Sequence, residues 1–260
     1  MATRVHPTAI IDGNAVLGED VEVGPWCIIG DGVVVGAGSR IGPHTRIEGP
    51  TKFGERNRIF GQSSFGTEPQ DLKFGGERTE LVIGNDNTFR EFVTINRGTV
   101  GGGGITTIGS NNFFMVSAHV AHDCHVGSST IFANAATLAG HVTVGDFATI
   151  GAFAAVHQFC RVGDHAFMGG FTVATQDVLP YAKTVGNRPA KTYGINTIGL
   201  RRKDFQPETI TALERAYRIL VRSKMKLEQA LEKIEADLAL YPEVRYLVDF
   251  VRASERGFIR

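Results

Sequence analysis

An apolar residue recurs at every sixth position over most of this chain, and few folds accept such a pattern. The pattern covers residues 5–65, returns over 83–95 and continues over 108–168, always with Val, Ile, Leu, Phe or Met at the periodic position. A helix repeats every 3.6 residues and a strand every two, so neither alone gives a period of six. A short strand followed by a corner does, and three such sides close a triangular coil made of three hexapeptides.

Glycine is the second part of the pattern. The chain has 32 glycines in 260 residues, and glycine directly follows the periodic residue at 14 of the 25 periodic positions. We expect these glycines to form corners with a left-handed backbone, which glycine, Asn and Asp tolerate better than other residues. The whole pattern is typical of the left-handed parallel β-helix and argues against an unrelated β-sandwich. The predicted fold class is mainly β.

The pattern also predicts two domains. Residues 1–190 form the β-helix, with protruding loops near 67–81 and 101–107 where the period breaks. Residues 191–260 form a C-terminal α-helical domain, because their apolar residues recur at helical spacing. Pro207 and Pro242 fall where a first helical turn accepts proline. Such a domain would cover the open end of the β-helix.

Composition narrows the function and the compartment. Lys plus Arg and Asp plus Glu both number 27, and this balance disfavours a generic nucleic-acid or acidic-membrane binder. The three cysteines are far apart in the sequence, which suits a reducing compartment. No stretch approaches the ~20 apolar residues of a membrane span. We expect a cytoplasmic protein with no nucleic-acid partner and no stable membrane insertion.

Five of the eight histidines lie between residues 119 and 157. The 18-residue coil places His122 beside Gly140 and Asp123 beside His141, with neighbouring coils about 4.8 Å apart. A histidine base beside an exposed backbone N–H suits acyl transfer, because the base takes a hydroxyl proton and the amide binds an oxyanion. Two other interpretations remain at this point: ordinary polar residues on the prism surface, and a zinc site of a metal-dependent lyase.

The run Arg201-Arg202-Lys203 precedes the helical stripes. Three consecutive cations suit a diphosphate or an acidic carrier protein, and the alternative is a solvated helix start.

Several motifs together resemble one family. The segments Ala118-His119-Val120-Ala121-His122-Asp123-Cys124, Leu138-Ala139-Gly140-His141 and Ala155-Val156-His157-Gln158-Phe159-Cys160 resemble the UDP-N-acetylglucosamine O-acyltransferases of lipid A biosynthesis. Gln70-Asp71-Leu72-Lys73, Arg97-Gly98-Thr99 and the helical tail extend the resemblance over essentially the whole chain.

This resemblance implies a homotrimer with active sites in the clefts between prisms. It implies transfer of an (R)-3-hydroxyacyl group from acyl carrier protein to the glucosamine 3-hydroxyl of UDP-N-acetylglucosamine, the first step of lipid A biosynthesis. His122 would be the general base, Asp123 its orienting partner and the Gly140 amide the oxyanion donor. No metal or organic cofactor of its own is expected, since the carrier protein brings phosphopantetheine.

The resemblance also assigns the substrate contacts: Asp71, Lys73, His119 and His141 at the sugar and acyl donor, His157 and Gln158 on the nucleotide side, Asn196 and Arg202 near the phosphates or the pantetheine arm, and Gly170 at the position that sets acyl-chain length. Glycine at residue 170 would leave room for a longer chain.

Three positions depart from the family pattern. Asn96 stands in place of a His, Ile198 in place of a Glu near the uridine, and Arg188 in place of a His at the distal end of the acyl channel. The acyl-chain length and the acceptor therefore stay open, and the 3-amino analogue of the sugar is an alternative acceptor. The N-acyltransferase of the same pathway carries an extra domain before its β-helix, whereas hexapeptides here begin at Val5. A non-catalytic trimeric β-helix scaffold is the alternative from outside enzymology.

Overall fold

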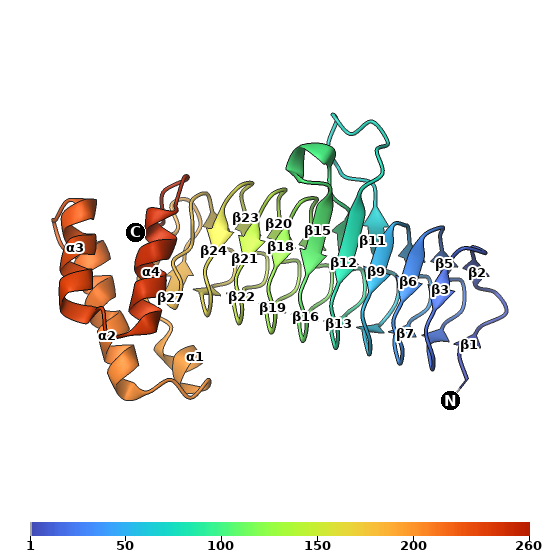
Figure 1. The fold of residues 1–260 in the computed structure, drawn as a ribbon, viewed down its shortest axis with the longest axis horizontal. Coiled ribbons are helices and arrows are strands. Elements are labelled where there is room, and N and C mark those ends of the chain that lie inside the picture. Colours follow the sequence, from blue (N-terminus) through green and yellow to red (C-terminus); the bar gives the residue numbers. More distant parts are fainter. Residues whose placement is uncertain (1) are drawn as a thin grey trace.

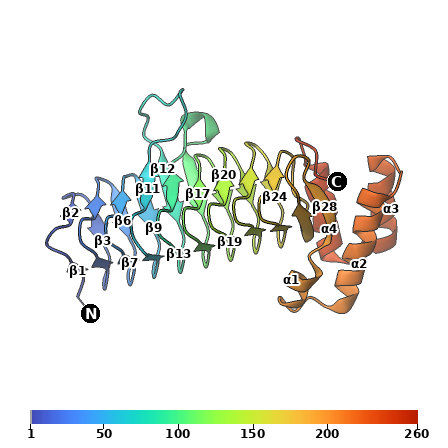
Figure 2. The same cartoon turned by 180° about the vertical axis from the view of Figure 1, so that it is seen from behind.

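The residues of the six-residue pattern form the interior of a long three-sided prism. The computed structural model describes residues 2–260, and Figures 1 and 2 show the prism with the helical domain at its C-terminal end. The periodic residues lie on short strands, usually as the last residue of the strand, and those from Val23 onward are buried. Phenylalanines stack along the axis of the prism: the ring centroids of Phe89 and Phe114 lie 5.1 Å apart, and those of Phe114 and Phe132 4.6 Å apart.

Three sheets make up the sides of the prism. The first sheet contains, in spatial order, β1 (Arg4–Val5), β4 (Glu22–Val23), β7 (Arg40–Ile41), β10 (Arg58–Ile59), β13 (Thr88–Phe89), β16 (Phe113–Phe114), β19 (Ile131–Phe132), β22 (Thr149–Ile150), β25 (Phe167–Met168), β27 (Ala182–Val185) and β28 (Lys191–Ile195). The second contains β2 (Ile10–Ile11), β5 (Ile28–Ile29), β8 (Arg46–Ile47), β11 (Ser64–Thr67), β14 (Thr94–Asn96), β17 (His119–Val120), β20 (Thr137–Leu138), β23 (Ala155–Val156) and β26 (Val173–Ala174). The third contains β3 (Val16–Leu17), β6 (Val33–Val35), β9 (Thr51–Phe53), β12 (Glu80–Ile83), β15 (Ile105–Ile108), β18 (His125–Val126), β21 (Thr143–Val144) and β24 (Arg161–Val162).

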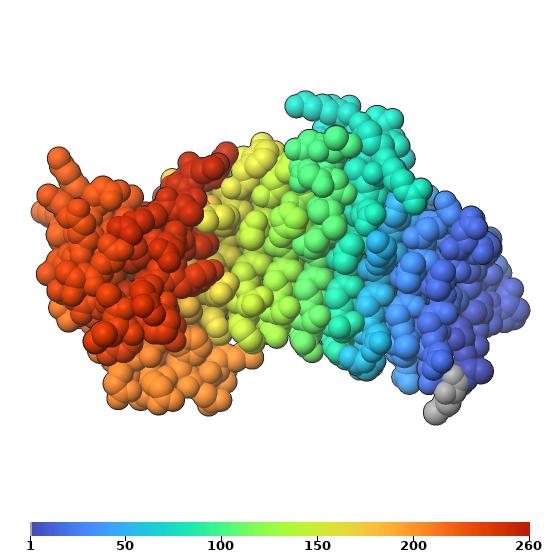
Figure 3. All heavy atoms as spheres, viewed as in Figure 1, coloured from blue at the N-terminus to red at the C-terminus, as the bar shows by residue number. Residues whose placement is uncertain are grey.

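The strand register confirms the 18-residue coil. Regular neighbours pair in parallel at that separation, as Val5 does with Val23. Two coils are longer than the rest, because Phe53 pairs with Ile83 and Ile83 pairs with Ile108. The extra twelve and seven residues both lie where the chain passes from the second sheet to the third. They protrude from the same edge of the prism, as Figures 1 and 3 show.

The corners differ from the prediction in one respect. The left-handed backbone falls three residues after the periodic residue, where Phe147, Phe153 and Phe159 have φ of 58°, 56° and 64°. Most glycines that directly follow the periodic residues have ordinary φ, so their predicted role as left-handed corners is wrong. Their physical reason is close approach of the next coil: a Cβ on Gly36 would lie 2.4 Å from the backbone of Gly54.

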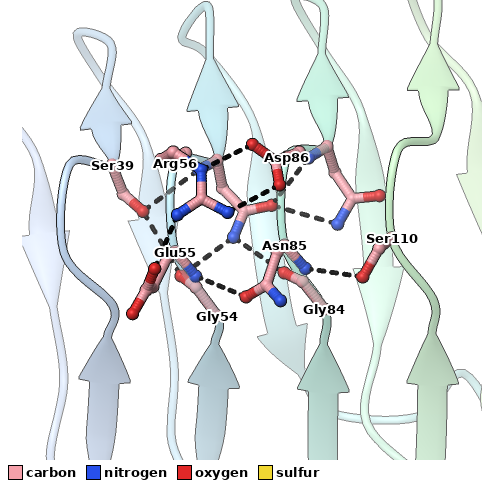
Figure 4. A network of polar contacts seen from close by, with 10 residues as sticks. Ser39, Gly54, Glu55, Arg56, Gly84, Asn85, Asp86 and Ser110 are labelled. Carbon is pink, nitrogen blue, oxygen red and sulfur yellow. Dashed lines mark hydrogen bonds and ion pairs between the residues drawn. The ribbon is translucent and has the colours of Figure 1, made fainter.

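Polar side chains tie successive coils together at the edge between the third and first sheets. Inside the prism, the Nδ2 of Asn87 donates to Oδ1 of Asn57 at 3.0 Å, and the amide of Asn112 donates to Oδ1 of Asn87 at 2.9 Å. A parallel ladder lies on the surface, where the Glu55 amide donates to Asn85 Oδ1 and the Asn85 amide donates to Ser110 Oγ (Figure 4). These bonds satisfy polar atoms at corners where the sheets do not meet.

Helices follow the prism and cover its end. They are α1 (Thr197–Arg201), α2 (Pro207–Tyr217), the π-helical η2 (Arg218–Arg222), α3 (Leu227–Leu238) and α4 (Pro242–Arg252), and a 3-10 turn η1 (Val100–Gly102) lies in the second insertion. The predicted helical stripes are buried in one apolar cluster, and Pro207 and Pro242 begin their helices as expected. Before α1, strand β28 adds an antiparallel partner to β27. Among residues 2–260, no helix has the length and apolar character needed to cross a membrane.

Candidate active site

The histidine cluster lies on the same prism edge as the two insertions. Asp123, His141 and Phe159 occupy the left-handed corner position of three successive coils, with φ of 58°, 61° and 64°. The amide of His141 donates to the carbonyl of His122 at 3.0 Å, which confirms the predicted stacking of these coils. The corner conformation turns these side chains away from the prism interior, so groups one full coil apart in sequence meet along one edge of the prism.

His122 and Asp123 form a hydrogen-bonded pair. The His122 Nδ1 lies 2.7 Å from Asp123 Oδ2, and the Asp123 side chain has no exposed surface. The same carboxylate accepts hydrogen bonds from the amide of Thr99 at 2.7 Å and from its hydroxyl at 2.6 Å. A proton on Nδ1 leaves the Nε2 lone pair of His122 free to act as a base.

Gly140 lies directly beside the His122 ring. A Cβ at residue 140 would lie 2.6 Å from Cε1 and 2.8 Å from Nε2 of His122, so only glycine leaves room for the imidazole. Within residues 2–260, the Gly140 N–H has no hydrogen-bond acceptor. A free amide next to a potential base is the arrangement that stabilises an oxyanion during acyl transfer.

Two further histidines surround this pair. The ring of His141 packs edge-on against His122 at 5.2 Å and stacks on Phe159 at 4.4 Å. Burial lowers the pKa of His141, and the negative charges of Asp123 and Asp71 partly oppose that lowering. Burial also lowers the pKa of His119, whose Nδ1 lies 2.8 Å from the Thr94 hydroxyl. Both rings are therefore biased toward the neutral form, in which they accept as well as donate hydrogen bonds.

The same cluster has the composition of a metal site. Ligand atoms of His122, Asp123 and His141 all lie within 4.8 Å of one another. However, Asp123 Oδ2 already accepts from the Thr99 hydroxyl and lies 2.7 Å from Nδ1 of His122. Both groups would have to move before that oxygen could bind a cation, so the donor set fits a proton-transfer pair better than a zinc site.

The other predicted site residues are spread over the molecule. Asp71 and Lys73 lie in the first insertion, where the Lys73 amide donates to Asp71 Oδ1 at 3.0 Å. His157 is exposed to solvent, and it lines a cavity of about 440 Å³ together with Arg188 and Arg256. Gln158 and Gly170 are exposed on corners of the prism.

Asn196 and Arg202 belong to the edge between the third and first sheets rather than to the histidine edge. Asn196 caps α1 by accepting from the Gly199 amide, and its Nδ2 donates to the carbonyl of His165 at 3.2 Å. Arg202 is exposed at the end of α1. One prism therefore does not bring these two residues to His122.

Sequence reasoning missed two neighbours of the pair. Phe159 follows from the same arithmetic, because it lies one regular coil beyond His141. Thr99 does not follow from it, because the insertion shifts the register and no spacing rule connects residues 99 and 123.

Known proteins resemble this chain over its full length. A sequence profile of UDP N-acetylglucosamine O-acyltransferase domain 2 matches residues 177–259, and the bacterial transferase hexapeptide profile matches 2–37 and 14–49. The acyl-(acyl-carrier-protein)–UDP-N-acetylglucosamine O-acyltransferase of Stenotrophomonas maltophilia is 49% identical over 259 residues, covering 100% of this chain and 98% of that protein. The enzyme of the same name from Syntrophobacter fumaroxidans is 46% identical, covering 99% of this chain and all of its own length.

Solved structures agree with these relatives. LpxA from Acinetobacter baumannii superposes with a TM-score of 0.96 at 43% identity, covering 98% of this chain and 99% of that one. LpxA from Bacteroides fragilis, described as a UDP-N-acetylglucosamine acyltransferase, gives a TM-score of 0.96 at 42% identity and covers 98% of this chain and all of its own. These likenesses confirm the predicted left-handed parallel β-helix with C-terminal helices. This chain belongs to the acyl-(acyl-carrier-protein)–UDP-N-acetylglucosamine O-acyltransferase family.

Proposed function

We propose that this protein transfers an (R)-3-hydroxyacyl group from acyl carrier protein to the glucosamine 3-hydroxyl of UDP-N-acetylglucosamine, the first step of lipid A biosynthesis. The observation that carries the proposal is the contact between the His122 ring and residue 140, with Asp123 on the other side of the ring. It puts a base and a free amide at one point on the surface, in a chain that belongs to this acyltransferase family.

The chemistry follows from these three residues. The Nε2 of His122 removes the proton of the sugar hydroxyl, and the hydroxyl oxygen attacks the thioester carbonyl of the donor. The Gly140 N–H donates to the oxyanion that forms, while Asp123 stabilises the imidazolium through Nδ1. When the intermediate collapses, the C–S bond breaks and the thiolate takes the proton from His122. The products are the sugar ester and the free phosphopantetheine thiol, and the protein needs no cofactor of its own.

Substrate contacts complete the proposal. Asp71, Lys73, His119 and His141 would hold the sugar and the acyl donor around His122. His157 and Gln158 would contact the nucleotide, and Gly170 would leave room for a long acyl chain. Arg202, with its neighbours Arg201 and Lys203, would attract phosphates or the acidic carrier protein.

We also propose that the active form is a homotrimer in the cytoplasm. Asn196 and Arg202 lie on a different prism edge from His122, so a second copy of the chain must supply them if they contact the same substrate. Cyclic packing of three prisms about a shared axis would place one edge against another. Light scattering at several protein concentrations gives the mass of the assembly, and a stable monomer would contradict this part.

The test is product mass spectrometry with purified protein. We expect acyl transfer from a series of (R)-3-hydroxyacyl carrier proteins to UDP-N-acetylglucosamine, and a loss of about 10²–10⁴-fold in rate for His122→Ala. His44→Ala is the matched control, because His44 is exposed on another edge of the prism. Transfer only to the 3-amino analogue would change the product to an amide. No transfer to either sugar, with the fold intact, would leave the scaffold interpretation.

A further inference from the structure

We infer that Thr99 is a positioning residue for the His122–Asp123 pair, and that the second insertion exists to deliver it. This inference rests on the proposed function. It concerns a residue that touches neither reacting group and acts through the carboxylate of Asp123.

Thr99 supplies most of the hydrogen bonds to that carboxylate. Its amide donates to Oδ1 at 2.7 Å and its hydroxyl donates to Oδ2 at 2.6 Å. Within the described chain, the remaining hydrogen bond to the carboxylate comes from His122. Two donors from one residue, one on each oxygen, fix the rotation of the carboxylate plane, and that plane aims Oδ2 at the His122 Nδ1.

Thr99 is itself held firmly. It caps the 3-10 turn η1, where its hydroxyl accepts from the Gly102 amide at 3.2 Å. Its carbonyl accepts from the Gly104 amide at 2.7 Å, and only 8% of the residue is exposed. The hydroxyl therefore has both a fixed donor and a fixed acceptor, and it cannot rotate away from Asp123 without losing one of them.

Residue 102 closes the far side of the carboxylate. A Cβ on Gly102 would lie 2.1 Å from Asp123 Cγ and 2.4 Å from each of its oxygens. The turn thus packs its backbone directly against Asp123, which leaves the carboxylate no second position.

A regular coil does not provide these contacts. The seven extra residues between β14 and β15 interrupt the repeat on the histidine edge and bring Thr99 and Gly102 over Asp123. A purely structural role for the insertion would require only that it stabilise its own turn. The two short bonds into a fully buried carboxylate that also binds His122 indicate that it orients the base.

The experiment compares two pairs of variants of the full chain. Thr99→Val keeps the shape and the amide but loses the hydroxyl, and Thr99→Ser restores the hydroxyl. Gly102→Ala places a methyl group against Asp123, whereas Gly101→Ala places one in the same turn where no atom lies within 4 Å. We expect kcat to fall about tenfold or more in Thr99→Val and Gly102→Ala, with KM for the sugar nucleotide within about twofold. Thr99→Ser and Gly101→Ala should stay close to the unmodified protein.

A second measurement does not depend on activity. Nitrogen-15 NMR of labelled histidine reports which ring nitrogen of His122 carries the proton. We expect a single Nδ1-protonated form in the unmodified protein and in Thr99→Ser, and a mixture of tautomers in Thr99→Val. Unchanged tautomer and unchanged kcat in both Thr99→Val and Gly102→Ala would overturn the inference. If the unmodified protein lacked transferase activity but Thr99→Val still showed the mixture of tautomers, the proposed function would fail while the positioning role would stand.

Discussion

At the scale of single residues, the site depends on residue 140 being glycine, because a side chain there would collide with the His122 ring. Gly140→Ala would place a methyl carbon 2.6 Å from the His122 ring, and the ring must turn or shift to accept it. Because base and amide act on the same reacting centre, we expect kcat to fall about 10²-fold. Initial-rate kinetics check this, with Gly13→Ala as the control because no atom lies within 4 Å of a Cβ there. Equal rates for the two variants would contradict the proposed place of the oxyanion.

The sequence predicts the contacts between coils at this site, but not the contact of Thr99 with Asp123. The 18-residue coil brings Asp123 beside His141, and it would also have placed Phe159 next in line. The contact between Thr99 and Asp123 crosses an insertion whose path no periodicity describes. Residues such as Asn196 lie on another edge, so the family resemblance groups residues that a single chain keeps apart.

At the scale of strands and corners, the buried asparagines bind neighbouring coils. Asn87 is fully buried, donates to Asn57 Oδ1 and to the Gly109 carbonyl, and accepts from the Asn112 amide. Asn87→Ala would leave these groups without partners in the interior. We expect the variant to lose about 2–4 kcal/mol in the free energy of unfolding, measured by urea denaturation.

The control for this prediction is Asn14→Ala. Asn14 is exposed, and water can replace its hydrogen bond to Asp31, so we expect a change within about 0.5 kcal/mol. A similar loss in both variants would mean that the internal ladder adds nothing specific to the prism.

The corners also show why a correct period can lead to a wrong local explanation. The period predicts where the chain turns, but not which residue of the turn adopts the left-handed conformation. That residue is Phe at several corners, where stacking on the next coil offsets the strain, as in the pair Phe153 and Phe171 with centroids 5.1 Å apart. The glycines one position after the strand leave room for the neighbouring backbone instead.

At the scale of the whole molecule, a partly buried ion pair of the prism, Arg161 with Asp177, also binds residues of the helical domain. Arg161 contacts Asp177 at 3.0 Å and donates to the carbonyl of Phe250 at 2.6 Å, while the Ser254 hydroxyl donates to the same carboxylate at 2.8 Å. Asp177→Asn would leave Arg161 partly buried without its counter-charge. We expect a loss of about 3 kcal/mol in stability and faster proteolysis near the C-terminus.

Glu235→Gln provides the comparison within the same domain. Glu235 pairs with Arg252 between two helices, but 39% of its side chain is exposed, so solvent screens the pair and we expect little change in stability. Digestion patterns that match for Asp177→Asn and Glu235→Gln would show that the Arg161 pair does not hold the domain in place.

The strand register has a consequence for how such a protein can change length over generations. Each regular coil pairs only with the coil before it and the coil after it. Duplicating the codons of one whole coil near the amino end, such as residues 6–23, would therefore add one coil to the prism without altering any neighbour of His122. Losing a number of residues that is not a multiple of six from a regular coil would instead put the wrong residues at the inward positions, unless a loop absorbs the difference as the two insertions do. The gene can therefore grow or shrink in whole coils, while the histidine edge keeps its distance from the helical end.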